Sequence, residues 1–351
     1  MKKKAALTII GWLISIVCLW SLFSRMNFHA LWDGFLSAKW GWLLLAALIN
    51  LAVMAVKAVR WQMIMEPGMS LRAERSNPAD NMGLLRPSPR NDGYWTILKA
   101  AFIGCAGNNV LPARGGDWLR IYLLGKWAGA SKASLASVTG LDKLFDGVSI
   151  LVLFGLFSFH SVGLGRGGQS FPEWVRHGTI VVSIVIAASL AVCYMLLIHH
   201  RRTNGTENLG PVRKLAKNLG AGMDMLANHK LVAKSIVVSL VSTLLQIVTI
   251  WCCQQAFDVH FNLWIAAVVF IAINLAIVIP SAPSGVGPFE AAAVLTYTWL
   301  HLKTETAFNI ALMYHAVQFF PVTILGFLFY FKTKGRHCEA PTGPWQSHVS
   351  T

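Results

Sequence analysis

Long apolar runs recur along almost the whole of this sequence, and they limit what the chain can fold into more than any other feature. The runs are Ala5–Phe23, Trp40–Val59, Val148–Val162, Ile180–Leu197, Ser235–Phe257, Leu263–Ile279, Phe289–Leu300 and Ala307–Phe331. Most of them approach the roughly 20 residues that an α-helix needs to cross a bilayer. Only 13% of the residues are charged, whereas soluble domains carry about 25%. The pattern predicts an all-α polytopic membrane protein with about eight spans.

The positive charge of the chain, formally +15, is unevenly divided between the loops that separate these runs. If Lys2–Lys4 lie in the cytoplasm, alternate loops lie outside the cell. Those outer loops hold only Arg25, Lys39, Arg166, Arg176 and Lys303 of the 30 Lys and Arg residues. Such an asymmetry is the positive-inside pattern of membrane proteins, not a nucleic-acid-binding surface. We therefore expect a cell inner membrane protein with both termini in the cytoplasm and no nucleic-acid partner.

The first apolar run resembles a secretory signal, because basic residues precede it. The run continues past the usual signal length, and Ser21–Ser24 offers no persuasive cleavage site. We expect it to be retained as the first helix.

Motifs of catalysis and of cofactor binding do not occur in the sequence. It contains no phosphate-binding loop, no nucleophile elbow and no His-Glu-x-x-His motif. The six cysteines form no Cys-x-x-Cys pair, and most fall within apolar runs, where free thiols commonly pack. We expect no metal, no cofactor and no enzyme activity.

Two stretches differ from the apolar remainder. Glu66–Asp92 holds several prolines and alternating charges without a helical period, which predicts a disordered cytoplasmic insert. Residues 333–351 predict a disordered cytoplasmic tail. Residues 1–332, apart from the insert, are then expected to form one transmembrane domain.

Two breaks rich in proline and glycine interrupt the apolar sequence. The first lies within Thr96–Lys132, whose apolar part is short and has basic flanks on both sides. It predicts a re-entrant hairpin that enters the membrane from the cytoplasm. The second runs from Pro280 to Glu290 and precedes a short apolar helix. Broken backbone at membrane depth must be buried in protein or line a polar cavity, and paired breaks of this kind point to a transporter's binding site.

Ionisable residues gather around the two breaks, and each would cost several kcal/mol if it stood alone in hydrocarbon. They are therefore expected to be paired or to face a wet cavity. The side chains of Arg114 and Arg120, with the backbone amides of Gly115 and Gly116, predict an anion site at a helix start. The residues expected to line the cavity are Asn109, Pro112, Arg114, Gly115, Gly116, Asp117, Arg120, Asp142, Lys143, Asp146, Pro280, Ser284, Gly285, Gly287 and Glu290.

Structural roles remain open for several of these residues. Asp142 and Asp146 share a helical face, so they require a cation opposite, which Arg114, Arg120 or Lys143 would supply. Alternatively, Arg120 and Lys143 are snorkelling residues at the membrane interface, and the acids only cap helices. Glu290 is equally well explained as an acid that complements a helix dipole. His315 and Gln318 are interpreted as packed or hydrogen-bonding groups of the last span.

In these motifs the sequence resembles the flippase-like membrane family typified by the transmembrane region of lysylphosphatidylglycerol synthase. The matching motifs are Asn109-x-x-Pro112-x-Arg114-x-Gly116-Asp117-x-x-Arg120, Asp142–Asp146 and Pro280-Ser-x-x-x-Gly285-x-Gly287-x-x-Glu290. The resemblance extends from the first span to Phe331, apart from the insert. It implies an integral inner-membrane protein related to phospholipid flippases, hopanoid-associated transport proteins and membrane parts of glycosyltransferases.

The resemblance also implies a role for single residues. Arg114, Asp117, Arg120, Asp146 and Glu290 would line a central cavity for a lipid head group. The soluble aminoacyltransferase domain of the synthase has no counterpart after Phe331, so we expect no synthesis of lysyl-lipid.

Three functional hypotheses follow from this reading. The first is translocation of an anionic phospholipid, a lipid-linked glycan or a hopanoid. The second is a non-transporting accessory subunit that binds membrane lipid and scaffolds a separate lipid-modifying enzyme or glycosyltransferase. The third, an intramembrane enzyme, rests only on the carboxylates of Asp142, Asp146 and Glu290.

Overall fold

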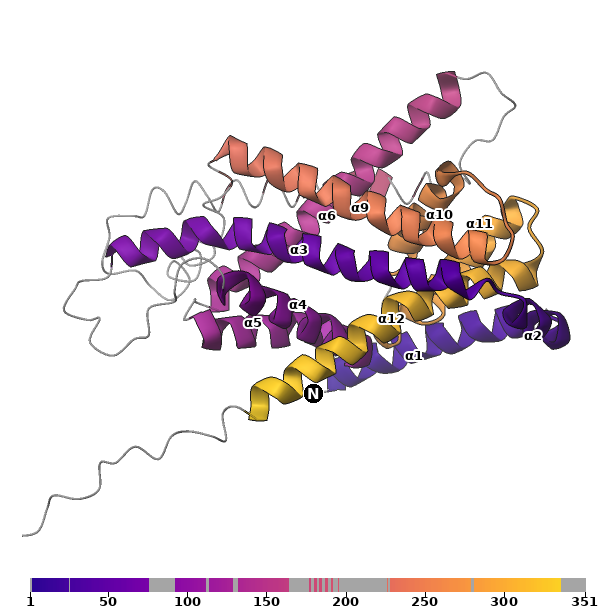
Figure 1. The fold of residues 1–351 in the computed structure, drawn as a ribbon, viewed down its shortest axis with the longest axis horizontal. Helices are drawn as coiled ribbons and strands as arrows, with labels where there is room; N and C mark the ends of the chain where they lie inside the picture. The colour runs from indigo at the N-terminus through magenta and orange to yellow at the C-terminus, as the bar shows by residue number, and fades with distance from the viewer. Residues whose placement is uncertain are drawn as a thin grey trace, which may run out of the picture.

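The computed structural model describes residues 2–24, 26–75, 92–111, 114–128, 132–163, 228–278 and 281–335, with ten isolated positions between 177 and 226. Within these residues the secondary structure is entirely helical (Figure 1). The elements are α1 (Lys2–Phe23), α2 (Phe28–Leu36), α3 (Trp40–Arg75), α4 (Asp92–Val110), α5 (Gly115–Ala128), α6 (Lys132–Gly163), α9 (His229–Ala256), α10 (Leu263–Ala276), the 3-10 turn η4 (Pro283–Gly285), α11 (Pro288–Trp299) and α12 (Thr304–Gly335).

Several of these helices have the length and composition of membrane spans. Among the described residues, Trp40–Met65 of α3, the whole of α9 and Thr304–Thr333 of α12 are long and apolar enough to cross a bilayer. Residues 11–23 of α1 and helix α2 meet at 91° and together qualify as a fourth candidate. Helix α10 is a shorter apolar helix. The expected fold, a polytopic helical membrane protein, is confirmed.

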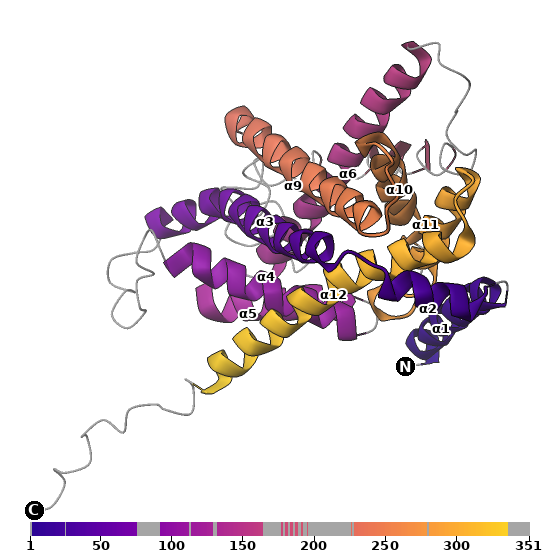
Figure 2. The same ribbon diagram turned by 45° about the vertical axis from the view of Figure 1, so that its right-hand side comes forward.

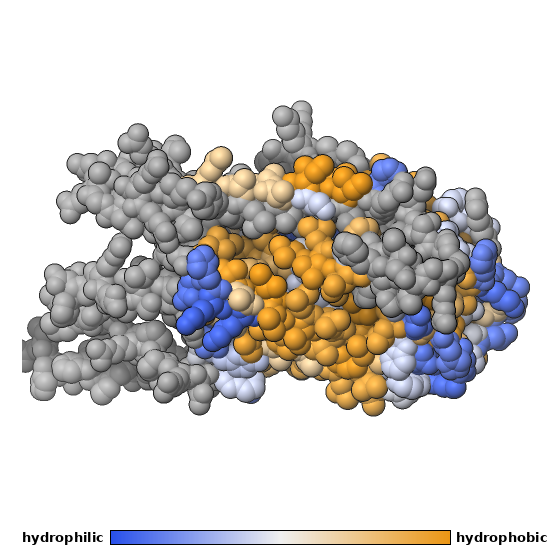
Figure 3. All heavy atoms as spheres, turned by 90° about the horizontal axis from the view of Figure 1, so that it is seen from above, coloured by the Kyte–Doolittle hydropathy of each residue, from blue (hydrophilic) through white to orange (hydrophobic). Residues whose placement is uncertain are grey.

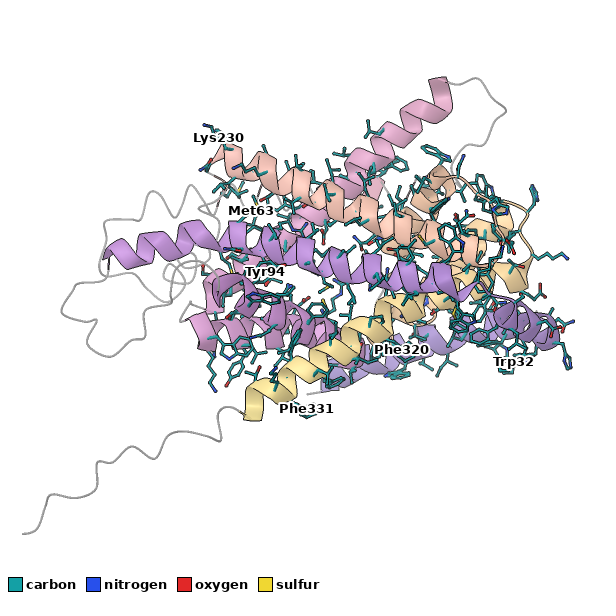
Figure 4. The ribbon with its side chains drawn as sticks, viewed as in Figure 1. Trp32, Met63, Tyr94, Lys230, Phe320 and Phe331 are labelled. Atoms are coloured by element: carbon teal, nitrogen blue, oxygen red, sulfur yellow. The ribbon has the colours of Figure 1, made fainter. Side chains whose placement is uncertain are left out.

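The surface has the polarity that a bilayer requires. Figure 3 shows an apolar band over the middle of one face, with hydrophilic residues toward both ends of the long axis. Trp32, which is 60% exposed, lies at one end, and Lys230 lies at the other (Figure 4). Exposed Trp residues favour the membrane interface. This is the polarity expected of a chain that crosses a bilayer along its long axis.

Two apolar clusters hold the bundle together. One gathers residues of α9, α10, α11 and the first half of α12, and the other gathers residues of α3, α4, α5 and α6. Helix α3 packs along α9, while α12 contacts α4 at one end and α11 at the other (Figures 1 and 2). Helix α12 consequently connects the two clusters, and the two sequence breaks lie beside it.

The expected insert and spans differ from the structure at their boundaries. Helix α3 continues to Arg75, so the first part of the expected disordered insert is helical. Residues 68–75 contain Met, Leu, Arg, Ala and Glu, which favour helix once a preceding span has nucleated it. Residues 76–91, the tail after Gly335 and most of the expected Ile180–Leu197 span lie outside the described residues.

Candidate functional site

The first break forms the turn of an antiparallel helical hairpin, α4–α5. A Cβ atom built on Gly107 would lie 2.8 Å from the Cα of Gly116, and one built on Gly104 would lie 2.9 Å from the Cβ of Arg120. Gly115 packs against Leu111 in the same way. Glycine permits such contact because it has no side chain. Gly116 is therefore packed against the backbone of α4. The expected anion site on the amides of Gly115 and Gly116 stays a prediction.

Asn108 closes the hairpin with two reciprocal hydrogen bonds. Its side-chain oxygen accepts from the backbone N–H of Asp117 at 3.1 Å, and its side-chain nitrogen donates to Oδ1 of Asp117, also at 3.1 Å. This first-turn N–H of α5 is thereby satisfied without an external ligand. The carboxylate of Asp117 is held in a fixed position beside Arg120.

Arg60 lies at the centre of an ion network formed by α3, α6 and α9. Its side chain is fully buried, and Nη1 donates to Asp146 at 2.6 Å and to the hydroxyl of Ser239 at 2.6 Å. Nη2 donates to Oδ1 of Asp142. Nζ of Lys57 lies 3.5 Å from the second oxygen of Asp146. Buried charges need such partners, because each ion gives up its hydration.

Arg120 approaches this network from α5 but is incompletely paired. Its Nη2 lies 3.6 Å from Asp117 and 3.8 Å from Asp142, which are ion-pair distances too long for hydrogen bonds. Neither Nε nor Nη2 has a hydrogen-bond partner among the described residues, although the side chain is only 8% exposed. The guanidinium carbon lies 3.7 Å from the ring centroid of Trp61, a cation–π contact. Arg120 thus remains a buried cation with donors available.

The network explains why two carboxylates share one face of α6. The cation opposite Asp142 and Asp146 is principally Arg60. Arg114 and Lys143, the other expected cations, are exposed. Asp142 and Asp146 also lie within α6, which begins at Lys132, and not ahead of a span that starts at Val148.

The second break forms a compact turn between α10 and α11, against α1. Gly285 and Gly287 have positive φ angles of 81° and 98°, which glycine adopts without strain. A Cβ atom on Gly287 would also lie 2.8 Å from the Cα of Ser15 on α1. The hydroxyl of Ser15 accepts from the backbone N–H of Ala282 at 2.9 Å. The helix α1 therefore fixes the turn from outside.

A hydrogen-bonded chain runs from this turn to α12. The N–H of Gly287 donates to Oε2 of Glu290 at 2.7 Å, so this acid caps α11, as one of the two readings expected. The other oxygen, Oε1, lies 2.5 Å from Nδ1 of His315. Nε2 of His315 lies 2.8 Å from the hydroxyl of Ser284. His315 is a hydrogen-bonding group, as expected, and its partner is the one carboxylate of the second break.

The two breaks are connected through shared elements. Helix α4 contacts η4 directly. Asn109, at the end of α4, donates from Nδ2 to the hydroxyl of Thr323 on α12 at 2.8 Å. Thr323 and His315 are eight residues apart on the same helix, about 12 Å along its axis. Helix α4 therefore contacts both the turn of the second break and the helix that carries His315.

The structure thus sorts the expected cavity residues into three groups. Asn109, Gly115, Gly116, Asp117, Arg120, Asp142, Asp146, Ser284, Gly285, Gly287 and Glu290 belong to the two connected clusters, Arg114 and Lys143 are exposed, and Pro112 and Pro280 lie outside the described residues. The prediction omitted Arg60, Trp61, Ser239 and Ser15. Only Arg60 carried a signal in the sequence, as a charge at the end of an apolar run.

Comparison with known proteins agrees with this architecture. A UPF0104 membrane protein of Methanothermobacter thermautotrophicus is 22% identical, over 93% of this chain and 94% of its own length. A UPF0104 membrane protein of Methanocaldococcus jannaschii is 19% identical, over 64% of this chain and 92% of its own. The family model described as the lysylphosphatidylglycerol synthase TM region matches residues 8–326, which include both breaks. The chain is a multi-pass membrane protein that belongs to the lysylphosphatidylglycerol synthase transmembrane region family.

Proposed function

We propose that this protein binds the anionic head group of a membrane lipid at Arg120 and moves the lipid between the leaflets of the cell inner membrane. The lipid is a phospholipid, a lipid-linked glycan or a hopanoid carrying a negative group. The protein moves the lipid without changing it chemically. Both termini lie in the cytoplasm in this proposal, in accordance with the distribution of Lys and Arg.

The observation that carries the proposal is the unsatisfied guanidinium of Arg120. A buried donor without a partner costs about 1–3 kcal/mol, and more when it is charged. A phosphate or carboxylate oxygen would accept from Nη2 and Nε, which are the donors without partners. The ring of Trp61 contacts the guanidinium carbon at 3.7 Å from its centroid, which limits how far the side chain can move.

The depth of the network also favours a head group. Arg60 follows Trp40 by twenty residues of continuous helix, about 30 Å. The hydrocarbon core is about 30 Å thick. The network therefore lies near the C-terminal end of the α3 span. This end faces the cytoplasm if Lys2–Lys4 do, as the distribution of positive charge predicts. A head group at that level leaves its acyl chains free to lie in the bilayer.

Leaflet exchange in proteoliposomes tests the proposal. The purified chain is reconstituted in vesicles of phosphatidylcholine and phosphatidylglycerol that contain fluorescently labelled phosphatidylglycerol, and the outer label is quenched chemically. We expect Arg120→Gln to slow exchange about 10- to 100-fold, the equivalent of the 1.5–3 kcal/mol of a hydrogen bond to a charged group. Arg120→Lys keeps the charge but not the planar fork, so its rate should be intermediate.

Lys126→Gln provides the matched control, because Lys126 is an exposed cation on the same helix. It should exchange lipid at the rate of the parent. Equal rates for the parent and Arg120→Gln would contradict the proposal. Binding of the labelled lipid by the parent without any exchange would support the accessory lipid-binding subunit instead.

A further inference from the structure

Glu290, His315 and Ser284 form a hydrogen-bonded chain that the binding of a head group at Arg120 does not use. Glu290 is 3% exposed and His315 is 7% exposed, so both are shielded from solvent. The ring of Phe289 lies 4.4 Å from the imidazole, centroid to centroid, and Phe319 meets it edge-on. The imidazole is therefore held between aromatic rings, with one nitrogen toward the carboxylate and the other toward the hydroxyl.

The hydrogen-bonded groups of Glu290, His315 and Ser284 lie near the middle of the membrane. His315 follows Thr304, the first residue of α12, by eleven residues, or about 16 Å. This is about half of the 30 Å hydrocarbon core. The α1 residues that contact the second break, Gly11 and Ser15, are also central in their helix.

Two kinds of chemistry have this arrangement of groups. The order carboxylate, imidazole, hydroxyl is that of a serine hydrolase, and Ser284 has a positive φ of 64°, as strained nucleophiles often do. Hydrolysis requires an ester carbonyl and water, however. Lipid ester groups lie at the membrane interface, about 15 Å from the midplane. Carboxylate–histidine chains at membrane depth are typical of proton relays in transporters. The depth of His315 favours the relay.

We propose that Glu290 and His315 together bind one proton, and that uptake of this proton accelerates lipid movement; the inference rests on the proposed function. In the unprotonated form the carboxylate is charged, neutral His315 donates from Nδ1, and Nε2 accepts from the hydroxyl of Ser284. The pair then carries a charge of −1. In the protonated form the imidazolium donates to both Glu290 and Ser284, the pair is neutral, and the hydroxyl hydrogen of Ser284 is released for another acceptor.

Neighbouring ionisable groups leave the pair as the only charge carrier in its immediate surroundings among the described residues. Cys18 of α1, Tyr314 of α12 and Cys253 of α9 face this region, and thiols and phenols are uncharged near neutral pH. Helix α10 has no ionisable residue. The cations of α3, Lys57 and Arg60, are bound to the carboxylates of α6.

The sign of the coupling follows from the charge. An anionic head group that crosses the midplane is repelled by a pair that carries −1, and this repulsion is strong where the dielectric constant is low. Uptake of a proton removes it. The released Ser284 hydroxyl becomes a donor to the passing anion. Lipid exchange should therefore accelerate as pH falls.

The test measures exchange of labelled phosphatidylglycerol by the parent chain at several pH values, equal on both sides of the vesicle. We expect a rate about tenfold higher at about pH 5 than at about pH 8, because acid favours the neutral, protonated form of the pair. The phosphodiester of the probe keeps its charge throughout this range. His315→Gln removes the imidazole but leaves the carboxyl of Glu290, so the acceleration at low pH should be smaller than in the parent. Glu290→Gln combined with His315→Gln removes both titrating groups, so its rate should not vary with pH.

Tyr297→Phe is the matched control. Tyr297 lies on α11, the helix that also carries Glu290, and its hydroxyl accepts a buried hydrogen bond from Gln254 of α9. The substitution removes this bond but no titrating group of the pair. It should keep the pH dependence of the parent even if its rate is lower. If a variant does not fold, the pH dependence of exchange by the unmodified protein still tests the proposal.

The outcomes separate the two proposals. Exchange that occurs at the same rate at every pH, and in His315→Gln as in the parent, overturns the proton coupling and leaves the lipid-transfer function intact. Absence of exchange at every pH overturns both. Covalent labelling of the parent at Ser284 by a fluorophosphonate, lost in Ser284→Ala, overturns the relay in favour of a catalytic serine.

Discussion

Replacement of Arg60 by alanine is expected to destabilise the chain by about 3–5 kcal/mol, because it leaves two carboxylates buried without their principal cation. Asp142 is 3% exposed, and the side chain of Asp146 is 25% exposed. Whole domains are stable by only about 5–15 kcal/mol. A loss of this size should abolish most of the folded protein recovered from the membrane.

Thermal unfolding of the purified protein in detergent, together with the yield of monodisperse protein, measures this effect. Lys39→Ala is the control, because Lys39 and Asp258 form an ion pair with side chains 55% and 57% exposed. Exposed pairs contribute about 0–1 kcal/mol, so this variant should unfold like the parent. Combining Arg60→Met with Asp142→Asn and Asp146→Asn should restore much of the stability, since the buried charges are then removed together. Normal stability of Arg60→Ala would show that the network is dispensable.

The fold could be predicted largely from hydrophobicity, because a bilayer allows few alternatives for an apolar chain of this kind. Every backbone N–H and C=O in hydrocarbon must be paired, and a helix achieves this within one segment. The apolar runs accordingly predict the start of α3 at Trp40 and the end of α9 at Ala256 to within a few residues. Helix ends in polar sequence could not be placed in this way. The extension of α3 through Arg75 and of α6 back to Lys132 depends on helix propagation and tertiary contacts, which no apolar boundary marks.

The candidate site was predictable in its residue types but less so in its pairing. The cost of isolated charge in hydrocarbon correctly required partners for Asp142 and Asp146. It could not show that Arg60, more than eighty positions earlier in the sequence, is the partner that makes the hydrogen bonds. Long-range contacts of this kind follow from how α3, α6 and α9 pack together. Similarly, Glu290 was recognised as a possible helix cap, but its approach to His315 depends on the packing of α11 against α12.

The role of the glycines in the first break also could not be predicted from the sequence. Gly115 and Gly116 predict an anion site at a helix start, because glycine allows a ligand to approach the backbone. Glycine equally allows another helix to approach it. The sequence does not distinguish the two, whereas the structure places α4 there.

A substitution at Gly116 should therefore act on folding of the α4–α5 hairpin. In Gly116→Ala the new Cβ would lie 2.7 Å from the carbonyl carbon of Gly107 and would collide with the carbonyl oxygen of Gly104 and the amide nitrogen of Asn108. These are backbone atoms, so no side-chain rotation can relieve the collision. The helices must separate, which also strains the hydrogen bonds between Asn108 and Asp117. Overpacking of a tight interface costs about 1–3 kcal/mol, and sometimes more.

Gly140→Ala is the matched control for this prediction, because nothing lies within 4 Å of a Cβ built on Gly140, which is also inside a helix. It should be neutral or stabilising by up to about 1 kcal/mol, since alanine favours helix. Gly116→Ala should lower the midpoint of thermal unfolding in detergent by several degrees and also slow lipid exchange, because Arg120 lies one helical turn away on α5. An unfolding midpoint equal to that of the parent would show that the two helices do not approach so closely. If stability falls and exchange does not, Arg120 does not depend on the hairpin for its position.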